Sequence, residues 1–388
     1  MENGKIVCLQ VIGGLSMGGA ESRVMDIARH IDKNKIRFDF LLDEPPGFYE
    51  PEALGLGCRI YRVPRFRFFN WFQYAHAMDR FFAEHKEIDI VQGSLTSTAS
   101  IYMPIAKKNG VPVTMGYARS AGVDPGPKGW LTRYLRRDLF HKCDIAAAVS
   151  SEAGDSVYGK GRSAKGEVMI IPDSFELDKF IPDADKTGRG LAIRKRYGLE
   201  DAFVVGHIGR FHYAKNHEFL LKIFAKIREK KENARLLLAG TGPLFDAVKK
   251  QASSMGIEKD VVFAGQTDEP EAFYQAFDVF VFPSRYEGLP GTVIEAQTAG
   301  VPCLMSDTIT KEAAVTDLVR VCKLDKSADI WADEACDLYG MWKEKYGDKG
   351  HASRIDDLKK AGFDVKTEAV RLEELYAKLL NDSGINRQ

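Results

Sequence analysis

Residues 282–296 have the sequence FPSRYEGLPGTVIEA and join three kinds of local structure. The apolar run that ends at Phe282 has the composition of a strand that is buried on both faces, as in a parallel sheet. A loop rich in Gly and Pro follows, and an apolar helical pattern then extends from Thr292 to Ala299. A buried strand that leads directly into a helix is the repeating unit of an α/β fold.

The same stretch carries candidate binding groups. Because the helix begins near Pro290, its first backbone N–H groups lack helical partners and predict a site that suits phosphate. Glu287 lies just before this site, and Glu295 lies about one turn inside the helix. Carboxylates beside a phosphate site need donors, and sugar hydroxyls are suitable ones. The alternative is that Glu287 only caps the helix and that Glu295 lies on its solvated face.

Strand and helix patterns alternate along the rest of the chain, which predicts two doubly wound Rossmann-like domains facing a central cleft. We expect one domain over residues 1–172, a second over residues 173–366, and a C-terminal helix within residues 367–388 that packs back on the first. The predicted strands are 6–12, 38–42, 59–63, 88–92, 113–115, 145–149, 168–171, 203–207, 236–239, 261–264, 279–282, 303–305 and 319–322. The predicted helices are 21–30, 71–85, 96–108, 131–143, 217–229, 244–255, 269–276, 292–299 and 367–380.

Composition excludes several classes of protein. The chain has 388 residues, of which 45% are hydrophobic and 28% are charged, and such a composition is not that of a disordered or fibrous protein. Its 55 Lys and Arg residues balance 55 Asp and Glu residues, so the net charge of zero gives no support to general polyanion binding.

Metal sites, disulfides and membrane spans are not indicated either. The six cysteines lie singly, and the eight histidines show no metal-binding pattern. The one Asp-x-Asp pair, Asp183 and Asp185, fits turn chemistry. The first residues do not resemble a signal peptide, and no apolar run reaches the roughly 18 residues of a spanning helix. We therefore expect a cytoplasmic protein.

A second candidate site follows the predicted strand 203–207. Gly209 and Arg210 come directly after this strand, and Lys215 follows five residues later, before the next helix. Two cations in one loop at the end of a strand could neutralise a single diphosphate. For each cation taken alone, a plain surface position is the alternative.

Two further glycine loops lack key residues of the nucleotide motifs that they approach. In the loop that begins with Gly240–Gly242, Phe245 stands where the dinucleotide fingerprint needs a third glycine. After Gly13–Gly18, Gly19 and Ala20 replace the Lys and the Ser or Thr of a P-loop, which excludes nucleotide hydrolysis of that kind. The second loop can still let its backbone approach a ligand closely.

Together these segments resemble glycosyltransferase family 4, the retaining nucleotide-sugar enzymes of the GT-B fold. The resemblance covers nearly the whole chain, and the segment with Glu287 and Glu295 is its most specific part. Within the family the chain is most similar to bacterial enzymes of exopolysaccharide, capsule or O-antigen assembly. The motifs that carry the resemblance are Gly18-Gly19-Ala20-Glu21, Gly209-Arg210 with Lys215, Ala239-Gly240-Thr241-Gly242-Pro243-Leu244, Phe282-Pro283-Ser284, and Glu287 with Glu295.

The resemblance implies a donor site in the second domain and an acceptor site in the first. Arg210 and Lys215 would hold the donor diphosphate, Glu287 would contact the donor sugar and Glu295 the ribose. Transfer would retain the anomeric configuration, with the leaving diphosphate as the base. The resemblance implies no metal and no cofactor. The donor nucleotide-sugar, a UDP-sugar, counts as a substrate. The other implied donor-binding residues are Gly18, Gly19, Gly209, Gly265, Gln266, Thr267, Leu289, Pro290, Gly291 and Thr292.

The chain departs from the family at two positions. Many members carry a histidine near the reacting sugar after the strand at 113–115, whereas this chain has Tyr117-Ala118-Arg119-Ser120. We therefore add Arg119 to the candidate catalytic residues, with a plain structural arginine as the alternative. The linker has Pro172-Asp173-Ser174 where Pro-Asn-Gly is common.

The neutral chain contains a basic, aromatic region. Residues 59–142 carry 14 Lys and Arg but only 6 Asp and Glu. Cations alternate with aromatic residues over 62–72 and again over 130–137, a mixture that suits an anionic bilayer surface. We expect a protein that is peripheral on the inner face of the cell membrane and takes a lipid-linked or oligosaccharide acceptor. The candidate contact residues are Arg62, Arg65, Arg67, Trp71, Trp130 and Arg133.

Other interpretations remain. The aromatic residues could be core and the cations merely solvated. Nucleic-acid binding has no further support. A UDP-sugar 2-epimerase would use a similar cleft, but it needs first-domain carboxylates, of which we find no cluster. A sugar-nucleotide binding protein without catalytic activity is the third possibility.

Overall fold

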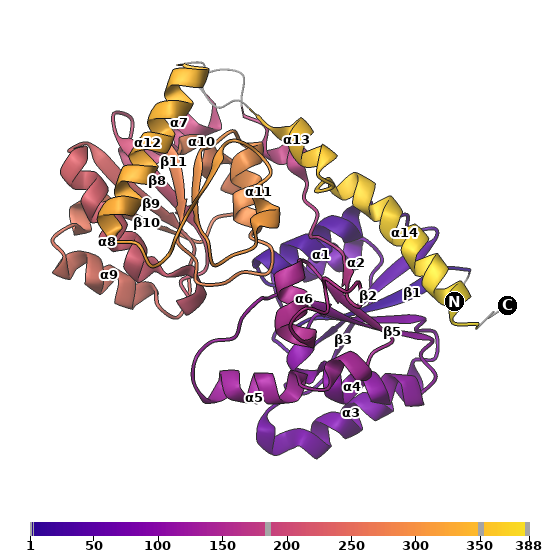
Figure 1. Cartoon of the computed structure of the whole chain (residues 1–388). Coiled ribbons are helices and arrows are strands. Elements are labelled where there is room, and N and C mark those ends of the chain that lie inside the picture. Colours follow the sequence, from indigo (N-terminus) through magenta and orange to yellow (C-terminus); the bar gives the residue numbers. More distant parts are fainter. Residues whose placement is uncertain (1, 3, 183–187, 348–352, 385–388) are drawn as a thin grey trace. The chain divides into compact units, whose positions relative to one another are not determined.

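The structure is a computed structural model that describes residues 2, 4–182, 188–347 and 353–384. The chain divides into two compact units. Unit 1 contains Met1–Phe175 and Gly362–Gln388, and unit 2 contains Glu176–Ala361. Each unit is built around its own parallel sheet, with helices packed outside it (Figure 1).

Unit 1 has a seven-stranded sheet in the order β3-β2-β1-β4-β5-β6-β7, and its strand pairs are parallel. The strands are β1 (Ile6–Val11), β2 (Ile36–Leu42), β3 (Ile60–Arg62), β4 (Ile90–Gly93), β5 (Val113–Ala118), β6 (Ile145–Ala148) and β7 (Met169–Ile170). The helices are α1 (Gly19–His30), α2 (Glu50–Gly55), α3 (Trp71–Glu84), α4 (Thr96–Lys108), α5 (Pro127–Arg136), α6 (Ser151–Tyr158) and α14 (Val365–Asp382).

Unit 2 has a six-stranded parallel sheet in the order β10-β9-β8-β11-β12-β13. The strands are β8 (Phe203–Ile208), β9 (Ala234–Ala239), β10 (Val261–Gly265), β11 (Val279–Phe282), β12 (Cys303–Ser306) and β13 (Val319–Cys322). The helices are α7 (Arg189–Tyr197), α8 (His217–Lys230), α9 (Phe245–Ser254), α10 (Pro270–Ala276), α11 (Gly291–Thr298), α12 (Ala328–Tyr346) and α13 (Ile355–Lys360). The predicted fold class, two Rossmann-like parallel-sheet domains, is confirmed.

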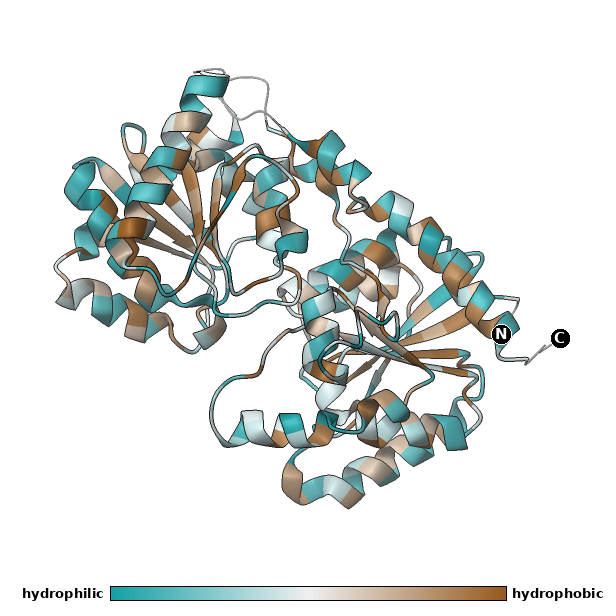
Figure 2. Cartoon of the chain, viewed as in Figure 1, coloured by the Kyte–Doolittle hydropathy of each residue, from teal (hydrophilic) through white to brown (hydrophobic). Residues whose placement is uncertain are grey.

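The core of each unit follows from strands that are buried on both faces. Figure 2 shows apolar strands inside each unit, whereas the outer helices alternate polar and apolar residues. In unit 2, Phe224 of α8 and Trp331 of α12 are fully buried in one cluster with the strands. Burial of each large apolar side chain contributes roughly 1.5–3 kcal/mol to the stability of the fold.

The C-terminal helix α14 belongs to unit 1 and packs beside α1. Asp364 caps its N-terminus, where the carboxylate accepts from Thr367 N at 3.2 Å. Farther along, the Tyr376 hydroxyl donates to Gln92 Oε1 of β4 at 2.6 Å, and Glu373 accepts from Asp32 N at 2.8 Å. These polar contacts tie the last helix to strands and loops from the start of the chain.

One predicted helix has different bounds in the structure, and α2, α6, α7, α12 and α13 were not predicted. The predicted helix 131–143 is α5, which begins at Pro127 and ends at Arg136, followed by a 3-10 turn at Leu139–His141. Proline fits the first helical position because its missing N–H would have no partner there. Helix α12 was not predicted, although Ser327 caps it by accepting from Ile330 N. The capping residue Ser327 was the sequence signal that could have located the start of α12.

Candidate functional site

The site in unit 2 lies where the strand order reverses. Strand β8 has β9 on one side and β11 on the other. The loops that follow β8 and β11 therefore begin next to each other, at the carboxyl ends of two neighbouring strands. Such a switch point, at the carboxyl ends of the strands, is where open parallel sheets bind ligands. Both loops that were predicted to carry charge, 209–216 and 283–290, start here.

Lys215 and Glu287 meet at this switch point, although 72 residues separate them in sequence. Lys215 Nζ donates to Glu287 Oε1 at 2.8 Å, and both side chains are largely buried. The ammonium group also lies 4.7 Å from the ring centre of Phe282, a cation–π contact. Arg210, from the same loop as Lys215, is exposed and has no ion-pair partner among the residues that the structure describes.

Helix α11 begins beside Glu287. Its N-terminal residue is Gly291, one residue before the predicted start, and Pro290 precedes it without a side-chain cap. The first backbone N–H groups of a helix have no helical acceptors and favour an anion. Two hydroxyl oxygens nearby, Ser284 Oγ and Thr292 Oγ1, are buried and have no hydrogen-bond partner within the described chain. Leu289 is buried beneath this end of the loop.

Glu295 is not on a solvated helix face. The residue is buried, and its Oε2 accepts from the Tyr274 hydroxyl of α10 at 2.9 Å. Burial of a carboxylate without partners would be costly, so this hydrogen bond helps to keep the group inside. The structure thus corrects the alternative in which Glu295 is a plain surface residue.

Three glycine turns lie against one another after β8, β9 and β10. Gly240 N donates to Gly265 O at 2.6 Å, and a Cβ on Gly240 would lie only 2.1 Å from Gly209 O. Only glycine allows this approach, because Gly240 also has a φ of +136°. Gln266 is exposed next to these turns, and Thr267 Oγ1 accepts from Glu269 N.

Two buried histidines under Lys215 were not predicted as part of the site. His207 Nδ1 lies 2.9 Å from Val281 O, and because a carbonyl can only accept, Nδ1 carries the proton. The His217 ring packs 4.8 Å from the His207 ring. Burial lowers the pKa of His207 to about 4 and that of His217 to about 2. Both rings are therefore neutral near pH 7, and Lys215 is the charged group beside them.

In unit 1, the predicted glycine loop also lies at a switch point, because β1 has β2 on one side and β4 on the other. Gly18 is the residue before α1 and Gly19 is its first residue. A Cβ on Gly18 would lie 2.2 Å from Glu21 Oε2, so the acidic side chain folds back over this turn. The N-terminus of α1 thus has a carboxylate close to it.

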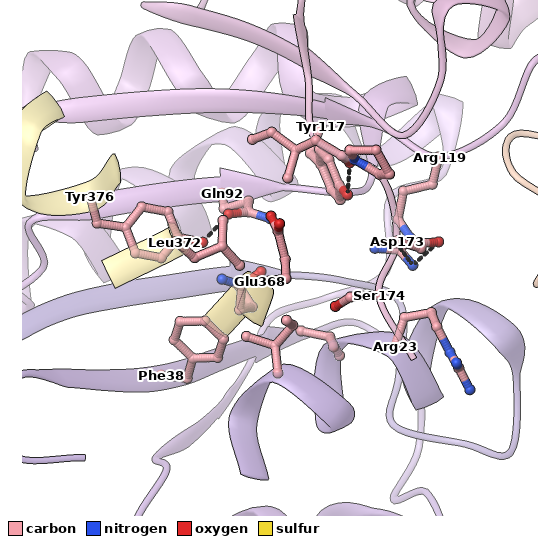
Figure 3. Close-up of a pocket in the computed structure, with 15 residues that line it drawn as sticks. Arg23, Phe38, Gln92, Tyr117, Arg119, Asp173, Ser174, Glu368, Leu372 and Tyr376 are labelled. Carbon is pink, nitrogen blue, oxygen red and sulfur yellow. Dashed lines mark hydrogen bonds and ion pairs between the residues drawn. The ribbon is translucent and has the colours of Figure 1, made fainter. Parts of the chain in front are cut away.

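Arg119 lies in unit 1 against a cavity of about 30 Å³ between the sheet and helices α1 and α14 (Figure 3). Its guanidinium pairs with Asp173 at 2.8 Å and lies 5.3 Å from the ring centre of Tyr117. Glu368 of α14 lines the same cavity, and burial raises the pKa of its carboxyl. Three buried polar atoms there have no partner among the described residues: Arg119 Nε, Ser174 Oγ and Glu368 Oε1.

The basic, aromatic segment of unit 1 is largely exposed. Phe69 and Phe72, on either side of the start of α3, are 82% and 88% exposed, and Trp130 on α5 is 65% exposed. The alternative that these aromatic residues are core is therefore wrong. Phe66 instead packs edge-on against Trp71 and Tyr74 of α3, and these contacts hold the segment against that helix.

The cations of this segment differ in their partners. Arg62 donates to both carboxylate oxygens of Glu50, at 2.6 Å to Oε2. Arg65 pairs with Glu44 at 3.2 Å, whereas Arg67 and Arg133 are exposed and have no ion pair within the described chain. The charge of Arg62 is thus already balanced inside unit 1.

Among the described residues, no three His, Cys, Asp or Glu side chains come together as metal ligands would. Asp183 and Asp185 lie outside the described residues. None of the described helices combines the length and apolarity of a bilayer-spanning segment.

Two doubly wound units, the second with a cation and a carboxylate at its switch point, are the components of a GT-B transferase. Residues 18–173 match the family described as glycosyl transferase 4-like domain, and residues 191–335 match that described as glycosyl transferases group 1. The protein EpsF of Bacillus subtilis, named as a glycosyltransferase, is 32% identical over 84% of this chain and 85% of its own length. The chain belongs to this glycosyltransferase family and is a transferase.

Proteins at lower identity are similar in sequence or in structure. A GDP-mannose-dependent phosphatidylinositol monomannoside mannosyltransferase of Mycolicibacterium smegmatis is 26% identical over 66% of this chain and 67% of its own. The Anabaena protein HepE, solved with UDP and glucose, has a TM-score of 0.76 at 14% identity and covers 96% of this chain and 100% of its own. Sucrose-phosphate synthase of Thermosynechococcus elongatus has a TM-score of 0.76 at 18% identity, with 97% and 100% covered.

The depressed pKa of His207 predicts an acid-sensitive unit 2. Between pH 6.5, the ordinary value, and about 4, the unfolded chain binds a proton that the folded unit does not, so stability falls as the pH is lowered through this range. His207→Phe keeps an aromatic ring beside Phe280 and Phe282 but cannot titrate. We expect it to flatten the pH dependence of the free energy of unfolding, measured by urea denaturation at several pH values. Equal slopes in both proteins would contradict this account, and His76→Phe, at an exposed histidine, is the control.

Proposed function

We propose that this protein transfers a sugar from a nucleotide-sugar, a UDP-sugar, to a saccharide acceptor in bacterial cell-surface polysaccharide synthesis, with retention of anomeric configuration. The observation that carries the proposal is the buried Lys215–Glu287 pair beside the N-terminus of α11. The pair combines a donor for phosphate oxygens with an acceptor for sugar hydroxyls at one point of the sheet.

The pair has spare hydrogen-bonding capacity. An ammonium group has three donors and Glu287 uses one, so Lys215 can also bond the oxygens of a diphosphate. Glu287 Oε2 can in turn accept from a hydroxyl of the donor sugar. Arg210 would supply a second charge from the same loop.

The surrounding residues suit the rest of the donor. The backbone N–H groups of 289–292, together with the hydroxyls of Ser284 and Thr292, would bind the diphosphate oxygens. Glu295 would hold the ribose, and Gly265–Thr267 would hold the base. In unit 1, the Gly18–Gly19 loop is proposed to contribute to the donor as well.

The proposed reaction needs no protein nucleophile. An acceptor hydroxyl attacks the anomeric carbon on the face from which the diphosphate leaves, the bond from that carbon to the diphosphate oxygen breaks, and the diphosphate takes the hydroxyl proton. Lys215 and Arg210 stabilise the negative charge that develops on the leaving group. We propose that no metal is required, because these two cations supply that charge. Arg119 lies in unit 1, where its guanidinium is paired with Asp173.

The relatives support the donor and acceptor classes. HepE was solved with UDP and glucose, and the mycobacterial relative is named for another nucleotide-sugar, GDP-mannose, and for a phosphatidylinositol mannoside acceptor. The proposal is tested by incubating the protein with UDP-sugars and GDP-sugars, with and without lipid-linked saccharides, with a chelator in parallel. We expect nucleotide release that depends on the acceptor and survives the chelator. Isomerised sugar without release would indicate an epimerase, and binding without turnover would indicate an inactive binding protein.

Lys215→Ala should lower turnover at least about tenfold, because it removes the charge that stabilises the leaving diphosphate. Lys222→Ala is the matched control, since Lys222 is an exposed lysine of α8 that pairs with Glu218 one turn away. Steady-state kinetics with the best donor would measure both variants. Unchanged turnover in Lys215→Ala would remove this role.

We further propose that unit 1 docks on the anionic inner leaflet and takes a lipid-linked acceptor there. The exposed rings of Phe69 and Phe72 would enter the interface, and Arg67 would contact the headgroups. A hydrogen bond from Arg67 N to Asn70 Oδ1 at 2.6 Å holds the turn that presents these rings.

The double variant Phe69→Ser/Phe72→Ser should weaken binding to anionic liposomes at least about tenfold, because burial of one such ring contributes roughly 1.5–3 kcal/mol. Arg67→Ala should weaken binding about fivefold, but only at low salt. Leu54→Ser, at an exposed apolar residue of α2, is the control. Liposome flotation measures all three, and undiminished binding of the double variant would contradict the proposal.

A further inference from the structure

The loops that carry Lys215 and Glu287 are joined to each other by more than that ion pair. The first loop, 213–216, follows β8, and the second, 283–287, follows β11. Three hydrogen bonds link them, from Asn216 Nδ2 to Pro283 O, from Arg285 N to Ala214 O and from Arg285 Nη1 to Tyr213 O. None of these bonds involves Lys215 or Glu287.

Asn216 has a backbone conformation that fits this linking role. Its φ is +56°, and it is the one non-glycine residue with positive φ in the part of the chain that the structure describes. Asn tolerates this left-handed region better than most residues. The residue is buried, ends the 3-10 turn at Tyr213–Lys215, and its amide donates to Pro283 O at 3.1 Å. The turn that Asn216 ends therefore holds Lys215 close to the second loop.

Arg285 holds the two loops from the other side. Its backbone N donates to Ala214 O at 2.7 Å, and its Nη1 donates to Tyr213 O at 2.8 Å. The guanidinium also lies 4.4 Å from the ring centre of Tyr213. A cation–π contact and a charge-assisted hydrogen bond thus act on the same residue.

The second loop is itself anchored to the sheet. Ser306 Oγ donates to Ser284 O at 2.5 Å, and Thr308 Oγ1 donates to the same oxygen at 2.9 Å. The first loop therefore gains a fixed support when Asn216 and Arg285 connect it to the second.

We propose that Asn216 and Arg285 are positioning residues that hold the Lys215 loop against the Glu287 loop, so that the two bind the donor diphosphate as one preassembled unit. This inference rests on the proposed function of that site. Preassembly matters because ordering a loop during binding lowers affinity by the free energy that the ordering costs. Asn216 and Arg285 act only through Lys215 and Glu287. Their substitution should therefore weaken binding of the diphosphate part of the donor and leave binding of the rest unchanged.

Asn216→Gly keeps the left-handed backbone but removes the amide donor, and Arg285→Ala removes the side-chain bond to Tyr213 O. Each should weaken UDP binding about fivefold, as expected for one lost hydrogen bond. Binding of uridine, which has no phosphate, should not change. Arg285→Lys, which can still donate one bond, should recover part of the affinity. Calorimetry for UDP and ligand-observed NMR for uridine would measure these values.

Asn233→Gly is the matched control. Asn233 Nδ2 also donates to a loop carbonyl, Asp201 O at 2.9 Å, but at the opposite end of the strands. We expect Asn233→Gly to lower thermal stability without lowering UDP affinity. UDP affinity equal to wild type in Asn216→Gly and Arg285→Ala would overturn the inference, and so would an equal loss for UDP and uridine. A wild-type protein that binds no UDP would instead contradict the proposed donor.

Discussion

The reversal of strand order in each sheet is the constraint on which the site depends. In unit 2, β8 lies between β9 and β11, so the loops after β8 and β11 begin next to each other at the carboxyl ends of neighbouring strands. Lys215 and Glu287 come from these two loops. A sheet with the strands in simple sequence order would separate β8 from β11 by two strands, and the ion pair could not form.

The chemistry of the site follows from burial at this position. Charge is costly in the interior, so burial lowers the pKa of both His207 and His217, and the Nζ of Lys215 beside them lies against Glu287 and the ring of Phe282. Glycine at 209 is part of the same arrangement, since a Cβ there would lie 3.2 Å from His207 Nε2 and 3.4 Å from Lys215 Cδ. The neutral rings and the small glycine thus surround a Lys215 side chain that is paired with Glu287.

The fold class could be predicted from the sequence, because strands that are buried on both faces carry continuous apolar runs. Lys215 and Glu287 could be named separately, but their contact could not, since it depends on which strands become neighbours. The sequence left open whether Phe69 and Phe72 are exposed or part of the core, because aromatic residues are usually buried and composition cannot show which side of a helix faces solvent. Helix α12 was missed for a local reason, since a weak capping signal at Ser327 was overlooked.

The excess of Lys and Arg over Asp and Glu in residues 59–142 should attract an anionic membrane less strongly than the residue count suggests. Arg62 is balanced by Glu50 and Arg119 by Asp173, both in partly buried pairs, and the exposed pair of Arg65 with Glu44 is weak. Only part of the excess charge can therefore act on a membrane, with Arg67 and Arg133 among its exposed members. Since each such cation contributes about 1 kcal/mol near an anionic surface, while a buried phenylalanine ring contributes roughly 1.5–3 kcal/mol, the aromatic residues should dominate the proposed docking. Binding of unit 1 to a membrane should consequently persist at salt concentrations that screen the arginines.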